Sequence, residues 1–246
     1  MRPVRHERAL SPDLSVAALN ARYEGAPAED ILHAGLRFWA GGIAVVSSFG
    51  ADAAVLLHMA AGINPHVPVL FVDTKMLFPQ TLEYQARLAA DLGLTDVRRI
   101  GVARSELRRA DPMGALHLRD ADACCQLRKV APLAQAMTLF QASITGRKRH
   151  QAATRADMAV FETDPAGRIR INPLAGWSAQ DLADYRDRHD LPPHPLVAEG
   201  YPSLGCVPCT SRVQPGEDPR AGRWRGQSKT ECGIHFGPKG AERIAQ

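Results

Sequence analysis

The cysteines of this 246-residue chain fall into two pairs and a single residue. One pair is adjacent, Cys124 and Cys125, and the other is spaced as Cys206-Val-Pro-Cys209, whereas Cys232 stands alone. Four thiolates from two pairs are a common ligand set for a [4Fe-4S] cluster, and they also suit a structural zinc ion. We therefore interpret the pairs as metal ligands and Cys232 as a separate working thiol.

The two pairs differ in how easily their sulfurs share one metal centre. A tight turn points the sulfurs of Cys206 and Cys209 the same way, whereas adjacent side chains diverge unless the backbone is bent locally. Zinc sites more often use two spaced pairs, so the adjacent pair favours an iron–sulfur cluster. Disulfides are one alternative, but the charged start, Met1-Arg-Pro-Val-Arg-His-Glu, does not resemble a secretory signal. Buried, inert cysteines are the other alternative.

Cys232 lies in a cationic part of the sequence. Its basic neighbours are Arg220, Arg223, Arg225, Lys229 and His235. Positive charges lower the pKa of a thiol from its usual value of about 8.5, and the thiolate is the reactive form. Gly233 leaves the sulfur uncrowded, so we interpret Cys232 as a nucleophile on a mobile tail. The alternative is an accidental surface thiol.

The composition excludes several classes of protein. Hydrophobic residues make up 45% of the chain and charged residues 23%, as in ordinary soluble globular proteins. A formal net charge of +4 argues against a dedicated nucleic-acid binder and permits a small anionic ligand. No apolar stretch is long enough to span a membrane. We expect a cytoplasmic protein with reduced thiols and neither a nucleic-acid partner nor a membrane association.

Short apolar runs alternate with helical patterns, which predicts an α/β fold with a mainly parallel sheet and helices on both faces. The predicted strands cover residues 43–46, 67–72, 97–102 and 142–145, with β-like pieces at 158–161 and 168–171. The predicted helices cover residues 29–40, 51–61 and 79–92, and a fourth begins at Ser178 with Asp181 in its first turn.

Frequent proline and glycine after Leu191 predict an irregular tail that carries chemistry rather than a second core. We divide the chain into an α/β nucleotide-binding domain over residues 1–205 and a C-terminal tail over residues 206–246. His194, in Pro-His-Pro, is interpreted as a turn residue rather than a catalytic base.

Three segments at the carboxyl ends of predicted strands could together bind an anionic nucleotide. The first, Ser47-Ser-Phe-Gly-Ala-Asp52, offers hydroxyls and backbone N–H groups near a helix start. Asp73 and Thr74 follow the second strand. Gly146-Arg-Lys-Arg-His150, with Arg155, supplies cations that suit phosphate and sulfate oxygens. Each of these segments is of a kind that is common in proteins. The prediction of a nucleotide site rests on their placement after successive strands.

Together these segments resemble the assimilatory adenylyl-sulfate and phosphoadenylyl-sulfate reductase family, from about Val45 to His235. The matching segments are Ser47-Ser-Phe-Gly50, Asp73-Thr-Lys-Met-Leu-Phe-Pro79, Cys124-Cys-Gln-Leu-Arg-Lys129, Ile144-Thr-Gly-Arg147 with Thr154-Arg155, Gly200-Tyr-Pro-Ser-Leu-Gly-Cys-Val-Pro-Cys209, Arg220-Ala-Gly-Arg223 and Glu231-Cys-Gly-Ile-His235. The last is highly specific to this family. The cysteine pairs resemble the subgroup that carries a [4Fe-4S] cluster and prefers adenosine 5′-phosphosulfate.

The resemblance implies an adenine nucleotide alpha hydrolase-like fold and a two-step reaction in assimilatory sulfate reduction for cysteine biosynthesis. The Cys232 thiolate attacks the sulfuryl sulfur and expels AMP, and reduced thioredoxin then releases sulfite from the S-sulfocysteine. The implied ligands of the [4Fe-4S] cluster are Cys124, Cys125, Cys206 and Cys209. The implied substrate-binding residues are Ser47, Ser48, Gly50, Asp73, Thr74, Lys129, Gly146, Arg147, Arg155, Arg220, Arg223 and His235.

One departure from the family pattern is Lys75, which stands where members often have glycine, so the approach of this turn to the ligand is in question. We expect the cluster to act structurally or electrostatically rather than as an electron carrier.

The main alternative activity is 3′-phosphoadenylyl-sulfate reduction, or the use of both substrates. An ATP pyrophosphatase would usually show Ser-Gly-Gly-x-Asp-Ser, which is absent. A non-enzyme alternative is an iron–sulfur or zinc-binding sensor. A homo-oligomer is compatible with the sequence.

Overall fold

The computed structural model of the chain describes residues 15–227, 229, 231 and 233. Within this part, six strands form one sheet in the order β3-β2-β1-β4-β6-β5. The strands are β1 (Ile43–Ser47), β2 (Val69–Val72), β3 (Val97–Ile100), β4 (Ala142–Thr145), β5 (Phe161–Thr163) and β6 (Ile169–Ile171). All neighbours pair in parallel except β5 and β6, which are antiparallel.

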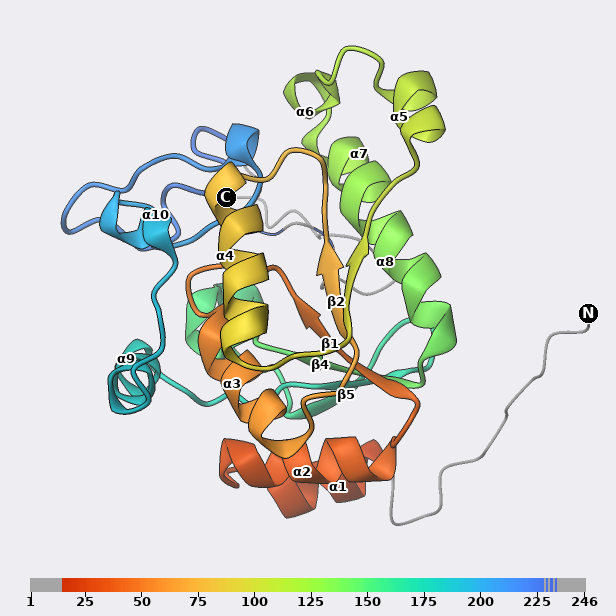
Figure 1. Cartoon of the computed structure of the whole chain (residues 1–246), viewed down its shortest axis with the longest axis vertical. Helices are drawn as coiled ribbons and strands as arrows, with labels where there is room; N and C mark the ends of the chain where they lie inside the picture. The colour runs from red at the N-terminus through yellow and green to blue at the C-terminus, as the bar shows by residue number, and fades with distance from the viewer. Residues whose placement is uncertain (1–14, 228, 230, 232, 234–246) are drawn as a thin grey trace, which may run out of the picture.

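Helices accompany the strands along the chain (Figure 1). Their bounds are α1 (Val16–Tyr23), α2 (Ala28–Phe38), α3 (Ala53–Ile63), α4 (Pro79–Asp91), α5 (Arg104–Ala110), α6 (Leu116–Arg119), α7 (Ala121–Cys125), α8 (Ala131–Ala136), α9 (Ala179–Arg188) and α10 (Pro195–Ala198). A π-helical turn, Gln126–Val130, joins α7 to α8. None of the described helices is long and apolar enough to cross a membrane.

The central strands β1, β2 and β4 are mostly apolar and almost fully buried, as expected for strands of a sheet that is covered on both faces. Successive side chains of a strand point to opposite faces. Val45 and Phe71 accordingly belong to the larger core, together with residues of α2, α3, α4 and α9. Ala44 and Leu70 belong to a smaller core, with Leu133 of α8. The predicted arrangement of helices on both faces of a mainly parallel sheet is confirmed.

Several predicted elements are close to the observed ones. The strand predicted at residues 142–145 is β4, the helix predicted at 79–92 is α4, and Ser178 and Asp181 form a capping box at the start of α9. The β-like piece predicted at 158–161 lies instead at β5, so that prediction was about two residues too early. Helices α1, α5 to α8 and α10 were not predicted. Helix α5 has no buried residue, so its sequence lacks the apolar stripe that marks a packed helix.

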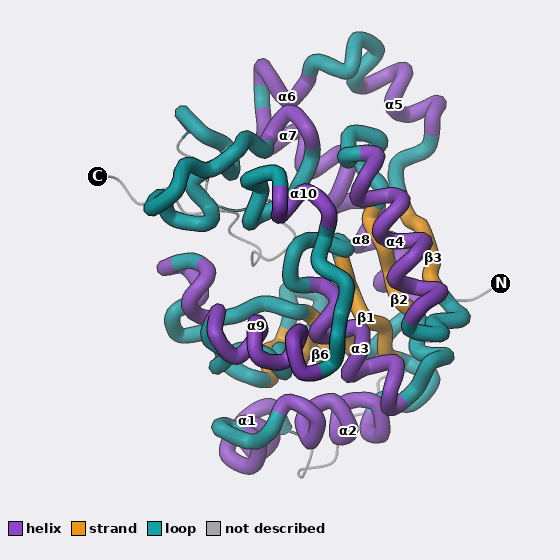
Figure 2. The backbone as a smooth tube through the Cα atoms, turned by 60° about the vertical axis from the view of Figure 1, so that its left-hand side comes forward, coloured by secondary structure: helices purple, strands orange, loops and turns teal. Residues whose placement is uncertain are grey.

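The C-terminal segment is irregular apart from α10 and a short 3₁₀ turn at Val207–Cys209. It returns to the sheet beside the segment that follows β2, where Val207 N–H donates to the Met76 carbonyl at 2.8 Å and Leu77 forms a bridge with Cys206. Figure 2 shows these loops near α6 and α7, with α1 and α2 at the opposite end of the molecule. The division at residue 205 stays a prediction.

His194 caps α10 rather than facing the site. Its side chain is fully buried. Leu196 N–H donates to Nδ1 at 3.2 Å, and Nε2 lies 3.1 Å from the Thr81 hydroxyl. Because Nδ1 accepts, the neutral ring donates from Nε2 to Thr81. Burial lowers the pKa of His194 from 6.5 to about 4.

This pKa predicts a loss of stability in mild acid. The unfolded chain takes up a proton at His194 near pH 6.5, whereas the folded protein resists protonation down to about pH 4. The free energy of unfolding therefore falls as pH falls through this window. Between pH 7 and pH 5 the wild type is expected to lose about 2 kcal/mol more than His194→Asn, which retains an acceptor for Leu196 N–H. Denaturant unfolding at both pH values checks this, and parallel losses would contradict it.

Candidate active site

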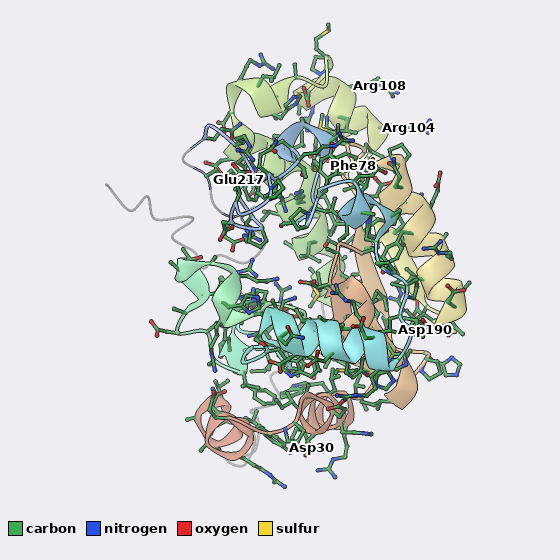
Figure 3. The ribbon with its side chains drawn as sticks, turned by 90° about the vertical axis from the view of Figure 1, so that its left-hand side faces the viewer. Asp30, Phe78, Arg104, Arg108, Asp190 and Glu217 are labelled. Atoms are coloured by element: carbon green, nitrogen blue, oxygen red, sulfur yellow. The ribbon has the colours of Figure 1, made fainter. Side chains whose placement is uncertain are left out.

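A cavity of about 280 Å³ opens at the carboxyl ends of β1, β2 and β4. Loops that follow these strands line it, and residues 202–205, 220, 223 and 224 of the C-terminal segment line it as well. In Figure 3, Phe78 at the start of α4 and Glu217 of the C-terminal segment lie toward one end of the molecule, and Asp30 of α2 lies at the opposite end. A cavity of the described residues thus lies at the strand-end location predicted for the site.

Most of the predicted substrate-binding residues line this cavity. They are Ser47, Ser48, Gly50, Thr74, Lys129, Gly146, Arg147, Arg155, Arg220 and Arg223. They come from five separate segments of the chain, which the fold brings together. His235 and Cys232 lie outside the described residues. Asp73 is described but does not line the cavity.

The Asp73 carboxylate is instead neutralised by two basic residues. Lys75 Nζ lies 2.6 Å from one oxygen and Lys75 N–H donates to the other at 2.9 Å, while Arg99 Nε is 3.8 Å away. Burial opposes ionisation of Asp73, but these contacts lower its pKa overall. Lys75 has a left-handed backbone (φ 61°), the conformation that glycine adopts most readily. Lys75 therefore adopts the backbone conformation that glycine would have in this turn. Its side chain pairs with Asp73 and does not line the cavity.

A cationic wall is formed by three basic side chains from the segment after β4. Arg147 pairs with Glu162, Lys148 lies 2.8 Å from Asp52, and Arg155 pairs with Glu231. Lys148 is almost fully buried, so its pKa is lowered by desolvation, and Asp52 opposes that shift. Each of these basic groups therefore has an acidic partner and retains a defined position.

The predicted set of substrate-binding residues did not include several polar residues of the cavity, which are Asp52, Thr81, Lys148, Gln151, Ser203 and Glu231. Lys148 lies inside the basic run that drew attention to this segment, and Asp52 ends the serine-rich loop, so both had a local signal. Glu231 pairs with a residue 76 positions away, and no local pattern indicates such a contact.

Arg223 forms part of the opposite wall. Its Nη1 donates to the Leu204 carbonyl at 2.7 Å, and its guanidinium lies 4.4 Å from the ring centroid of Trp224. Gly205 passes so close that an added Cβ would lie 2.3 Å from Arg223 Nη2. The absence of a side chain at residue 205 thus allows Arg223 to take this position.

The two cysteine pairs come from separate elements. Cys124 and Cys125 end α7, and the wider π-helical turn begins at the next residue. Such a turn changes the direction of neighbouring side chains, as an adjacent pair of ligands requires. Cys206 directly precedes the 3₁₀ turn and Cys209 ends it. Cys206 Sγ lies 3.2 Å from the Thr74 hydroxyl, and Thr74 lines the cavity.

Electrostatics place the pairs in one neighbourhood. The pKa of Cys124 is raised by burial and further by Cys206 and Cys209, while Arg128 acts in the opposite direction. Burial and Cys206 likewise raise the pKa of Cys209, against Lys129, Arg223 and Lys229. Among the described residues, no three histidine, cysteine or carboxylate side chains converge closely enough to be recognised as a metal site.

Comparison with known proteins identifies the family. Residues 42–212 match the model of the phosphoadenosine phosphosulfate reductase domain. The chain belongs to this family. A relative from Chelativorans sp. (strain BNC1), named adenosine 5′-phosphosulfate reductase, is 50% identical and covers 92% of this chain and 93% of its own. A relative of the same name from Mesorhizobium japonicum is 57% identical over 79% of this chain and 76% of its own.

Solved structures support the same family fold. The phosphoadenylyl-sulfate reductase of Candida auris, in a phosphate complex, is 27% identical with a TM-score of 0.69, over 83% of this chain and 98% of that chain. FMN adenylyltransferase of Candida glabrata shares the fold at 15% identity and a TM-score of 0.55, over 81% and 66% of the two chains. The resemblance inferred from the motifs and the predicted α/β architecture are confirmed.

Proposed function

We propose that this protein reduces adenosine 5′-phosphosulfate to sulfite and AMP in assimilatory sulfate reduction, with Cys232 as the nucleophile and thioredoxin as the reductant. The relatives named adenosine 5′-phosphosulfate reductase support this substrate. The observation that carries the proposal is that Lys129, Arg155, Arg220 and Arg223 converge from separate segments on one cavity. Convergent cations of this kind suit the adjacent phosphate and sulfate groups of one ligand.

The cavity has parts that fit both halves of such a substrate. Val46, Leu56 and Val72 provide apolar surface for an adenine ring. Ser47, Ser48 and backbone N–H groups of the same loop suit ribose or phosphate oxygens. The cations of the two walls neutralise the phosphosulfate and would stabilise the charge that develops on the departing AMP.

The proposed reaction proceeds in two steps. The Cys232 thiolate forms a bond to the sulfuryl sulfur, and the bond from that sulfur to the phosphate oxygen breaks, with its electron pair leaving on AMP. A thioredoxin thiolate then attacks the S-sulfocysteine at the Cys232 sulfur, and sulfite departs with the electron pair of the sulfur–sulfur bond. The second thioredoxin thiol releases Cys232 from the mixed disulfide. Thioredoxin thus supplies two electrons and ends as a disulfide.

We also propose that Cys124, Cys125, Cys206 and Cys209 hold a [4Fe-4S] cluster. Three observations support the fit: Cys206 and Cys209 raise the pKa of the Cys124 thiol, the Thr74 hydroxyl lies against Cys206, and cations act to lower the pKa of Cys124 and Cys209 in turn. A bound cluster would supply structural cross-linking and a fixed charge beside the cavity. Arg128, Lys129 and Arg223 would balance that charge. The cytoplasmic location and a homo-oligomeric state stay predictions.

A direct assay tests the proposed activity. Anaerobically purified protein with reduced thioredoxin is expected to release sulfite and AMP from adenosine 5′-phosphosulfate, and more slowly from the 3′-phosphorylated form. Faster turnover of the 3′-phosphorylated form would reverse the substrate preference. A sensor would bind the nucleotide without releasing sulfite, and that result would overturn the enzyme assignment.

Gly205→Ala is expected to weaken substrate binding. The new Cβ would overlap the guanidinium of Arg223, so this side chain must leave its contact with Leu204. Loss of one charged contact to the phosphosulfate is expected to raise KM about 10-fold. Steady-state sulfite release measures the change. Gly216→Ala serves as the control in the same segment because an added Cβ there meets no atom within 4 Å, although its left-handed backbone adds some strain. Equal KM values for the two variants would contradict this role of Gly205.

A further inference from the structure

Glu231 is buried between two arginines of the cavity. Only 4% of the residue is exposed, and its carboxylate oxygens lie 2.7 and 2.8 Å from Arg155 Nη2. Arg220 Nη2 is 3.5 Å from the same carboxylate. These are the two arginines that we propose to bind the phosphosulfate. The acidic group on the cationic wall therefore comes from the C-terminal segment itself.

Glu231 is also the residue directly before Cys232 in the chain. On the other side of Cys232, an added Cβ at Gly233 would lie 3.5 Å from Val130, the neighbour of Lys129 in the π-helical turn. Lys229, two residues before Glu231, pairs with Asp122 of α7. Lys229 is thus attached to α7 and Glu231 to the cationic wall, while Gly233 lies beside the π-helical turn. Consecutive Cα atoms are about 3.8 Å apart, so attachment of Glu231 restricts where its neighbour can lie.

Arg155 can hold Glu231 and a substrate oxygen at the same time. Its Nη1 donates to Gln151 Oε1 at 2.8 Å and its Nη2 faces Glu231. Its Nε–H has no hydrogen-bond partner among the described residues, although it is buried. A guanidinium has five N–H donors in a fixed plane, so one group can orient both the segment and the ligand.

We propose that Glu231 is a positioning residue: its ion pair with Arg155 and Arg220 holds the segment that carries Cys232 against the bound phosphosulfate. This inference rests on the proposed role of Cys232 as the nucleophile. The Glu231 carboxylate positions the Cys232 sulfur for attack. It contributes little to nucleotide affinity, because the nucleotide makes its own contacts with both walls of the cavity. A small misplacement of a reacting atom costs far more in rate than in binding.

The test measures formation of the sulfonated protein directly. Full-length protein is mixed with saturating adenosine 5′-phosphosulfate without thioredoxin, quenched at intervals and analysed by intact mass, and AMP affinity is measured in parallel. Glu231→Gln retains the side-chain shape and removes the charge. Its sulfonation rate is expected to fall by about 10- to 100-fold, with AMP affinity within about 2-fold of the wild type. Glu231→Asp retains the charge and is expected to recover part of the rate.

The matched control is Glu217→Gln. Glu217 belongs to the same segment and pairs with Arg225 at 2.8 Å, but it does not line the cavity. Its removal is expected to leave the sulfonation rate unchanged. If Glu231→Gln reacts as fast as the wild type, the inference is wrong. If its rate and AMP affinity fall together, Glu231 shapes the cavity instead, and the inference is again wrong.

Two further outcomes separate this inference from the proposed function. A wild type that forms no sulfonated species would remove the nucleophile assignment itself. If Glu231→Gln does not fold, Glu231→Asp decides the question: a wild-type rate in this shortened variant would overturn the positioning role, and a reduced rate with unchanged AMP affinity would support it.

Discussion

Sulfite production is expected to fall by at least about 10³-fold when Cys232 is replaced by serine, the largest change in activity that we predict. A serine hydroxyl is scarcely ionised at neutral pH, whereas a thiolate near cations is an effective nucleophile. Serine also cannot form the sulfur–sulfur bond that thioredoxin reduces. Sulfite release with saturating adenosine 5′-phosphosulfate and thioredoxin measures the loss.

Two properties of the Cys232→Ser variant should stay unchanged. AMP affinity should match that of the wild type because the proposed nucleotide contacts lie on other residues. Bound iron should also match because Cys232 is outside the proposed ligand set. Retention of more than about a tenth of the activity would show that another group is the nucleophile. Loss of iron would show that the five cysteines are divided differently.

The largest change in stability is expected for Asp111→Asn. Asp111 and Arg128 form an ion pair of 2.6 Å whose side chains are 0% and 5% exposed. Arg128 also donates to the Thr74 carbonyl at 2.9 Å, and Asp111 accepts from Leu116 N–H at 3.0 Å. Removal of the carboxylate charge leaves a buried guanidinium uncompensated. The free energy of unfolding is expected to fall by about 3 kcal/mol or more, measured by denaturant titration.

Asp96→Asn is the matched control for this prediction. Asp96 pairs with Arg98 at the same distance of 2.6 Å, but both side chains are at least one-third exposed. Water screens such a pair, so its loss is expected to cost less than about 1 kcal/mol. Similar losses in the two variants would show that burial does not set the strength of the Asp111 pair.

Much of the sheet could be predicted because its strands are buried on both sides. Such strands appear in the sequence as short, continuous apolar runs, as at residues 43–46 and 69–72. The site residues that follow the strands were also predictable, since parallel strands end at one edge of the sheet. Ser47 ends β1, Thr74 follows β2 and Arg147 follows β4, and all three line one cavity.

The features that escaped prediction depend on contacts between distant residues. Asp73 follows β2 as expected, but the backbone of Lys75 turns its ammonium group onto that carboxylate, which the residue types alone do not indicate. Glu231 has no local signal because its partner Arg155 is brought near it by the fold. Helix α5 packs no residue into the core, so hydrophobic periodicity could not reveal it.

The most direct test of the central claim is intact mass analysis of the wild-type protein after exposure to adenosine 5′-phosphosulfate without thioredoxin. Our proposal predicts a gain of one sulfonate, located on Cys232 by peptide mapping and removed by reduced thioredoxin with release of sulfite. The 3′-phosphorylated nucleotide is expected to give the same species more slowly. No sulfonated protein from either nucleotide, or a sulfonate on another residue, would contradict the role of Cys232.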